Sequence, residues 1–214
     1  ERKMFEPIPE IRTSSGNYIR WSEIPVTGTD NKGQNIKKVR VRIMGTNKKP
    51  ETLVQCWTAW EEYQEEEDGN KETKSRPHRE PFVKGKPCSK YLKELDKDEN
   101  PKCAWNTIVW NADEERLMVW EITQSTIKEA ILSLANNSAW GGKAEDGTSL
   151  KDVSRFTVEV SKTGDFKNTT YQVNAEPPAG PAPQEIVDAV KEARIDVRVL
   201  VNGENNGDPF GALG

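Results

Sequence analysis

Apolar and charged residues alternate along Asn35–Gly45, and this is the clearest pattern in the chain. A period of two is typical of a half-buried strand, with one face on the core and the other in solvent. The apolar face holds Val39, Val41 and Ile43, and the charged face holds Lys38, Arg40 and Arg42. Similar patterns and turn residues predict further strands over Thr52–Tyr63, Ala104–Asn111, Arg116–Ile122, Val153–Lys162 and Thr169–Ala175.

Apolar residues three and four positions apart predict one good helix, Thr123–Asn137, in which Ile127, Ile131 and Leu134 share a face. Thr123 is its expected N-cap residue. A shorter helix is predicted over Gln184–Ala193, after a linker rich in proline.

Polar, glycine-rich or proline-rich stretches predict irregular segments elsewhere. Residues 1–35 are expected to form an arm, with one short strand near Tyr18–Trp21. Residues 64–102 are expected to be an insertion, an acidic loop over 64–74 followed by an irregular basic stretch. Residues 177–214 are expected to hold the linker, the short helix and a tail rich in glycine and asparagine.

The order of these elements is strands, one helix and then two closing strands, which is the order of an OB barrel. We therefore predict a mainly β fold over residues 36–176. It is a five-stranded OB-type barrel with an extra hairpin, the insertion and one helix between its third and fourth strands. Other small β-barrels share this order, so the pattern alone leaves them open.

Basic residues are unevenly distributed, although the 214-residue chain has a net charge of −4. The first basic window, Lys37–Lys49, contains six basic residues and no acidic ones. On a strand, Lys38, Arg40 and Arg42 would lie about 7 Å apart on one face, close to the spacing of phosphates along a single nucleic-acid strand. The alternative is a solvated outer face that acids on neighbouring strands balance.

The second basic window, Lys71–Lys93, interleaves cations with aromatic rings. Its candidate DNA-binding residues are Arg76, Arg79, Phe82, Lys84, Lys86 and Tyr91. Rings that stack on bases and cations that neutralise phosphates are the requirements of a single-strand binder without sequence preference. The alternative is a disordered loop whose charges offset the acidic stretch Glu61–Asp68.

The chain contains seven tryptophans, and Trp57, Trp60 and Trp105 are added to the candidate DNA-binding residues. Trp57 and Trp60 point to opposite faces of their strand, so at most one of them belongs to the core by simple alternation. Any single tryptophan is more often a packing residue. For the whole set, at least one exposed stacking platform is expected.

Candidate catalytic and metal-binding residues are few. The only histidine is His78, and no nucleophile with a base, phosphate loop or paired carboxylates stands out, so no enzyme activity and no cofactor are predicted. The three cysteines Cys56, Cys88 and Cys103 are too widely spaced for a disulfide framework, which indicates a reducing cytoplasm. With His78 they could supply four zinc ligands, but no closely spaced cysteine pair is present, and no metal is predicted.

The run Ala104–Asn111, with its Val-Trp-Asn ending, and the run Leu117–Ile127, with its Glu-Ile-Thr-Gln sequence, together resemble the signature block of phage single-stranded DNA-binding proteins. The resemblance extends over about residues 38–210. It implies an OB fold, single-stranded DNA binding without sequence preference, and a role in phage DNA replication and recombination in the host cytoplasm. It also suggests that Asp208, Pro209 and Phe210 form an exposed tip that docks replication or recombination proteins.

The sequence therefore predicts single-stranded DNA as the partner, and no membrane association, since no long apolar run is present. Two other readings stay open. One is an OB-like adaptor that binds a protein of a phage replication complex and never touches DNA. The other is a nuclease or other enzyme, which the lack of a clustered acid or histidine site disfavours.

Overall fold

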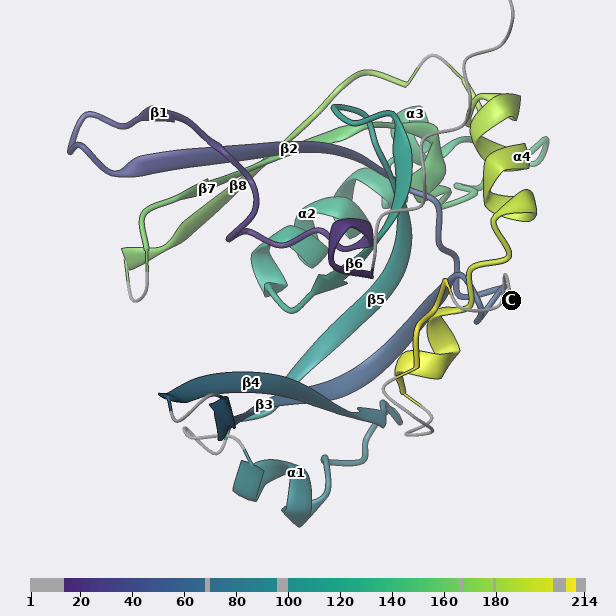
Figure 1. Ribbon diagram of the computed structural model, residues 1–214. Helices are drawn as coiled ribbons and strands as arrows, with labels where there is room; N and C mark the ends of the chain where they lie inside the picture. The colour runs from purple at the N-terminus through teal and green to yellow at the C-terminus, as the bar shows by residue number, and fades with distance from the viewer. Residues whose placement is uncertain are drawn as a thin grey trace, which may run out of the picture.

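The computed structural model describes residues 14–67, 70–95, 100–165, 168–178, 180–201 and 207–210. This part of the chain is mainly β, with one antiparallel sheet and four α-helices around it (Figure 1). The strands are β1 (Val26–Thr29), β2 (Asn35–Ile43), β3 (Leu53–Glu67), β4 (Asn70–Pro81), β5 (Lys102–Asn111), β6 (Arg116–Ile122), β7 (Val158–Thr163) and β8 (Thr170–Ala175). The α-helices are α1 (Lys90–Leu95), α2 (Ser125–Asn136), α3 (Ser138–Gly141) and α4 (Gln184–Glu192), and short 3-10 helices cover Ser14–Asn17, Val153–Arg155 and Val197–Leu200.

Strands β2 and β5 join the two parts of the sheet. The strand order is β4-β3-β5-β2-β7-β8, with β1 added to β2 and β6 added to β5. Strand β5 pairs with β3 along its first half and with the end of β2 at Val109–Asn111. Within the described residues no pairing connects β6 to β8, so the sheet is open there. Helix α2 contacts β8 and packs against the core between these strands (Figure 1).

The main core lies between the inner face of β2, the strands beside it and α2. The predicted apolar face of β2 is confirmed, because Val39, Val41 and Ile43 are all buried. Ile127 and Ile131 on α2 are also buried in this cluster, as their spacing predicts. Burial of these side chains is the main source of stability for such a fold.

Most of the predicted elements are found within a few residues of their expected ends. Helix α2 begins at Ser125 with Gln124 as its N-cap residue, so the prediction of Thr123 was wrong. Near the N-terminus, Tyr18 forms a single bridge to Val119 and not a strand. The exposed strand Val26–Thr29 (β1) was missed because it has no buried face from which to read a pattern.

The prediction of an acidic loop and an irregular stretch after residue 64 was wrong. Strand β3 continues to Glu67, and β4 pairs with it from Cys56↔Pro81 to Glu67↔Asn70. This hairpin crosses the lower part of Figure 1, with α1 beneath it. Its outer half is stabilised by opposite charges across the strands, such as Glu61 with Arg76, and not by apolar residues. The outer half of the hairpin therefore has no alternation of apolar and polar residues from which its strands could be predicted.

The prediction of an irregular tail after the C-terminal helix was wrong for residues 195–201. After α4, Ile195 and Val197 are buried against Ile108 and Val119 of the sheet. The backbone N–H of Val197 donates to the carbonyl of Glu51 at 2.9 Å, which fixes the segment to the loop before β3. Ile195, Val197 and Leu200 thus belong to a second hydrophobic cluster. None of the helices in the described ranges has the length and apolar character needed to span a membrane.

Candidate nucleic-acid interface

The charged face of β2 carries the cations that the sequence predicts, but acids from neighbouring elements neutralise two of them. The amine of Lys38 lies 3.1 Å from a carboxylate oxygen of Glu159 on β7. Arg40 donates to the carboxylate of Glu176 through Nε at 3.0 Å, and its Nη1 lies 3.7 Å from Asp113. The hydrogen bond to Glu176 also raises the pKa of Arg40. Both cations therefore already have counter-ions.

Arg42 is part of the packing and not of an open surface. Its guanidinium is half-buried and donates to the carbonyl of Ser154 at 2.7 Å and to Oγ1 of Thr157 at 3.3 Å. Burial lowers the pKa of this guanidinium. The hydrogen bonds tie β2 to the segment that leads into β7. This is a structural role that the alternating pattern could not reveal.

The two arginines of the second basic window that are candidate DNA contacts, Arg76 and Arg79, lie on β4 in the structure and also form ion pairs. Nε of Arg76 donates to Glu61 at 2.7 Å, and Nε2 of His78 lies 2.7 Å from the same oxygen. These hydrogen bonds, with the one from Arg76 first, lower the pKa of Glu61. Nε of Arg79 donates to Glu121 on β6 at 2.6 Å, with side chains only 13% and 16% exposed. The Arg79–Glu121 pair therefore lies in the body of the domain.

The stretch from Phe82 to Lys93, which we name the lysine segment, differs from the basic face of β2 and from the arginines of β4. It runs from the end of β4 into α1, and its start is fixed by a hydrogen bond from the Phe82 N–H to the carbonyl of Gln55 at 3.1 Å. All four of its lysines, Lys84, Lys86, Lys90 and Lys93, are exposed, and Lys90 pairs with Glu94 at 3.3 Å, which leaves Lys84, Lys86 and Lys93. In the described part of the chain, none of the three has an ion pair.

Helix α1 holds the second half of the lysine segment on the hairpin. Leu92 is buried, and both the N–H and the hydroxyl of Ser89 donate to the carboxylate of Glu80 on β4. This anchoring leaves Tyr91 60% exposed, with its ring edge-on to His78 at a centroid distance of 6.1 Å. The lysine segment thus carries an exposed ring and three exposed lysines that have no ion pair among the described residues.

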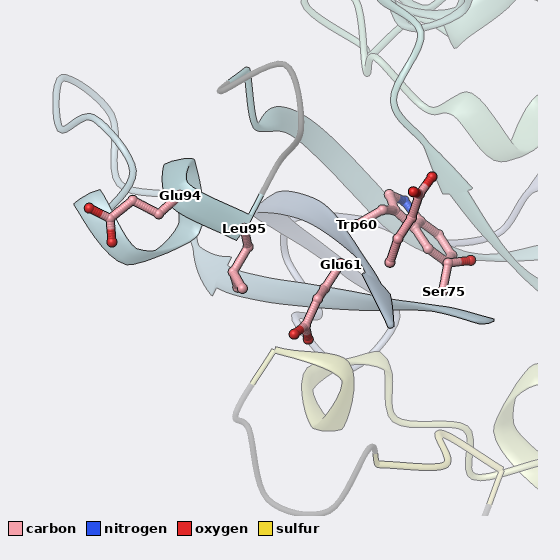
Figure 2. A pocket seen from close by; sticks show the side chains of 6 residues that line it. Trp60, Glu61, Ser75, Glu94 and Leu95 are labelled. Atoms are coloured by element: carbon pink, nitrogen blue, oxygen red, sulfur yellow. The ribbon is translucent and has the colours of Figure 1, made fainter. Parts of the chain in front are cut away.

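The predicted aromatic residues fall into two groups. Trp57 and Phe82 pack on each other at a centroid distance of 5.4 Å and are half-buried, and Trp105 packs against the main core. Trp60 is 48% exposed. It lines an open cavity of about 530 Å³ together with Glu61, Glu62, Ser75, Glu94 and Leu95 (Figure 2). This lining contains carboxylates and no cation, which disfavours a phosphate backbone at Trp60.

The possible zinc ligands do not come together. The thiol of Cys56 is buried, accepts a hydrogen bond from Nδ2 of Asn106 at 3.1 Å, and has its pKa raised to about 12 by burial. His78 is bound to Glu61. In the described ranges, which include all three cysteines and His78, no group of three or more His, Cys, Asp or Glu residues could hold a metal ion.

The prediction that Asp208, Pro209 and Phe210 form an exposed tip was wrong for Pro209 and Phe210, and Asp208 is exposed. Pro209 is buried and its carbonyl accepts the N–H of Asp196 at 3.0 Å. The ring of Phe210 packs edge-on against Tyr18 at 6.1 Å. The second hydrophobic cluster thus holds the phenylalanine and a backbone hydrogen bond holds the proline, so docking through them would require the segment to leave the domain.

A second cavity, which the sequence did not indicate, lies between the N-terminal segment and β2. It has a volume of about 410 Å³, an apolar part that includes Ile19 and Met118, and a rim that includes Lys38 and Arg40. The rim also contains the ion pair of Arg116 with Glu114. Because the rim charges of both signs are paired, this cavity does not provide a basic track.

Comparison of the chain with protein families, with curated proteins and with solved structures finds no significant match.

Proposed function

We propose that the protein binds single-stranded DNA without sequence preference, and that the lysine segment is its main contact surface. The observation that carries this proposal is that one segment holds the exposed ring of Tyr91 and the exposed lysines Lys84, Lys86 and Lys93, which have no ion pairs in the described part of the chain. Cations without counter-ions can neutralise phosphates, and an exposed ring can stack on a base of any sequence.

The fold and the resemblance of the sequence support the same function. We propose that the open sheet is a variant of the OB-type barrel, since a helix follows the first strands and two strands follow the helix. The signature block that resembles phage single-stranded DNA-binding proteins forms β5, β6 and the start of α2. Phage DNA replication and recombination, in the host cytoplasm, are the processes that this resemblance suggests.

The mechanism would be passive. Lysines draw in the backbone of an unpaired strand, and Tyr91 stacks on one of its bases. Because the protein would bind the single strand and not the duplex, it would shift the pairing equilibrium toward the open form by mass action. No catalytic step is part of this proposal.

The direct test is titration of a fluorescently labelled oligo(dT) with the protein, measured by anisotropy at low and at physiological salt. We expect binding that weakens steeply with salt, and much weaker binding of a duplex of the same length. Equal affinity at both salt concentrations, or a preference for the duplex, contradicts the proposal. Absence of any DNA binding would favour the protein-binding adaptor.

A further inference from the structure

Strand β8 lies at the end of the sheet opposite to β4, and it pairs with β7 on one side only. In Figure 1 it lies with β1, β2 and β7 in the upper part of the molecule, away from the hairpin of β3 and β4. Within the described residues no strand pairs with its other side. Strand β8 is therefore an edge strand.

The outer main-chain groups of β8 belong to Tyr171, Val173 and Ala175. The N–H of Glu176 donates to the carbonyl of Thr157 at 2.9 Å, in the same antiparallel register that pairs β7 with β8. In an antiparallel ladder, successive residues point their main-chain groups alternately toward one neighbour and the other. Tyr171, Val173 and Ala175 therefore point their N–H and C=O groups away from β7. Among the described residues these groups have no hydrogen-bond partner, so β8 presents a row of unpaired donors and acceptors.

The edge at β4 is protected by prolines. The N–H of Phe82 donates to the carbonyl of Gln55 at 3.1 Å, so the same alternation directs the main-chain groups of Pro77 and Pro81 outward. A proline has no N–H to offer, and natural sheets use it to prevent pairing at an edge. Lys71, near the start of β4, adds an exposed charge at an outward position. The edge at β4 is therefore a poor template for a further strand.

The edges at β1 and β6 are protected in other ways. Strand β1 is only four residues long, and its register with β2 shifts between Val26 and Gly28. The N–H of Ile19 donates to the carbonyl of Val119 on β6 at 2.9 Å, so the N-terminal segment occupies part of that edge. Strand β8, in contrast, contains no proline, no charged residue and no register shift over Thr170–Ala175. Among the edges of the described sheet, β8 therefore remains open to pairing.

We propose that β8 pairs antiparallel with β8 of a second copy of this chain, so that two sheets join about a two-fold axis at Val173. Main-chain groups that point outward must face each other, which places Val173 opposite Val173 of the second copy and Tyr171 opposite Ala175. On the exposed face, Gln172 then lies opposite Asn174 of the second copy. A two-fold interface uses the same patch on both copies, so the assembly closes at a dimer.

The side chains of β8 favour a second copy over a charged partner strand. No like charges meet in this register, because the six residues of the strand are uncharged. The ring of Tyr171 faces the small side chain of Ala175. Gln172 donates to Asn174 within the strand at 3.4 Å, and each amide keeps a further donor and acceptor for the second copy. A charged strand would find no opposite charge on β8 to select it, whereas the sequence of β8 is complementary to itself.

Sedimentation velocity of the full chain without DNA, over a series of protein concentrations, tests the proposal. We expect a monomer at low concentration and a dimer at high concentration. Gln172→Lys/Asn174→Lys places like charges opposite each other twice in the dimer, which should raise its dissociation constant roughly tenfold. Both side chains are exposed, so the variant should fold, and thermal melting followed by circular dichroism checks this.

A complementary variant tests the register itself. Gln172→Glu/Asn174→Glu should also dimerise weakly alone. Its equimolar mixture with the lysine variant should form a dimer, because opposite charges then face each other. A mixture that stays monomeric overturns the proposed pairing.

A matched control separates edge pairing from a general effect of charge. Thr73→Lys/Ser75→Lys adds the same charges at two exposed positions of β4, and it should dimerise like the unchanged protein. A monomer at every concentration, growth beyond the dimer, or equal weakening by this control overturns the proposal. So does unchanged dimerisation of the folded lysine variant of β8.

This inference does not rest on DNA binding. Lys84→Gln/Lys86→Gln should dimerise like the unchanged protein, because the lysine segment follows β4 at the other end of the strand order. A dimer that fails to bind oligo(dT) would contradict only the proposed function. A monomer that binds oligo(dT) would contradict only the pairing of β8.

Discussion

Strand β2 and the lysine segment are both basic in the sequence, but the fold pairs Lys38 and Arg40 on β2 with acids and leaves Lys84 and Lys86 without ion pairs among the described residues. On β2, Lys38 faces Glu159 of β7, and Arg40 faces Glu176 just after β8. In the lysine segment, Lys84 and Lys86 follow the edge strand β4 and leave the sheet, and no acid among the described residues forms an ion pair with them. The comparison shows that the availability of a cation depends on its cross-strand neighbours, which can be more than a hundred residues away.

The same contrast applies within the second basic window. Arg79 lies on β4 and pairs with Glu121, which lies on β6. Lys84 lies beyond the end of β4 and has no ion pair in the described part of the chain. A cation within the sheet therefore forms an ion pair with a neighbouring strand, whereas a cation beyond the end of a strand stays available to bind phosphate. Substitutions in the two regions should therefore have effects of different size on stability and on DNA affinity.

The largest effect is expected from Arg79→Met. The substitution leaves the carboxylate of Glu121 mostly buried without its partner, which should lower the free energy of unfolding by about 2–4 kcal/mol. Urea denaturation followed by circular dichroism measures the loss. The double variant Arg79→Met/Glu121→Gln should recover part of it. A loss below about 0.5 kcal/mol, as is usual for surface substitutions, would place Arg79 among the available cations.

A smaller effect, on binding and not on stability, is expected from Tyr91→Ala. Loss of one stacked ring should weaken oligo(dT) binding by about 1–3 kcal/mol, while the 60% exposed ring contributes little to folding. Anisotropy titration measures the affinity and thermal melting measures the stability. Tyr91→Phe keeps the ring and should bind almost as well. Unchanged affinity in Tyr91→Ala would remove this residue from the interface.

A still smaller effect is expected from Lys38→Gln/Arg40→Gln on β2. Both ion pairs are partly exposed to solvent, so the free energy of unfolding should fall by only about 0–1 kcal/mol. Affinity for oligo(dT) should be nearly unchanged, because the removed cations are already neutralised. A marked loss of DNA binding in this folded variant would mean that phosphates displace Glu159 and Glu176, and the distinction between the two regions would fail.

The smallest effect concerns the dependence of stability on pH. The pKa of Glu61 is lower in the folded chain than its usual value of 4.5, because Arg76 and His78 hydrogen-bond to the carboxylate. Its stabilising contribution is therefore present above pH 4.5 and is lost as the pH falls through the folded pKa. Melting temperatures of the protein and of Glu61→Gln should converge in this acidic range. A constant difference between them at all pH values would contradict this assignment.

The sequence predicts the apolar parts of this fold well and the polar parts badly. The apolar face of β2 and the helix of Ile127 and Ile131 were predictable, because burial imposes a periodic pattern. The outer hairpin was not, because Glu61 and Arg76 stabilise each other across strands and leave no hydrophobic period. Nor was the packing of Phe210 on Tyr18, because these two residues lie far apart in the sequence.

The candidate site was predictable only as a set of residue types. The second basic window was predicted to contain cations and rings, and the structure exposes Tyr91 and Lys84 there. Which cations are available depended on partners that no local pattern reveals, such as Glu121 for Arg79. The acidic surroundings of Trp60 could have been noticed from its neighbours Glu61 and Glu62, but the contribution of Glu94 from α1 required the fold.

The central claim is tested most directly by the salt dependence of oligo(dT) binding in two double variants. For Lys84→Gln/Lys86→Gln, we predict weaker binding and a slope of log affinity against log salt that is reduced by about 1.4, since each phosphate contact on a single strand contributes roughly 0.7. For Lys38→Gln/Arg40→Gln, we predict the affinity and slope of the unchanged protein. An unchanged slope in the first variant together with a reduced slope in the second would contradict the account.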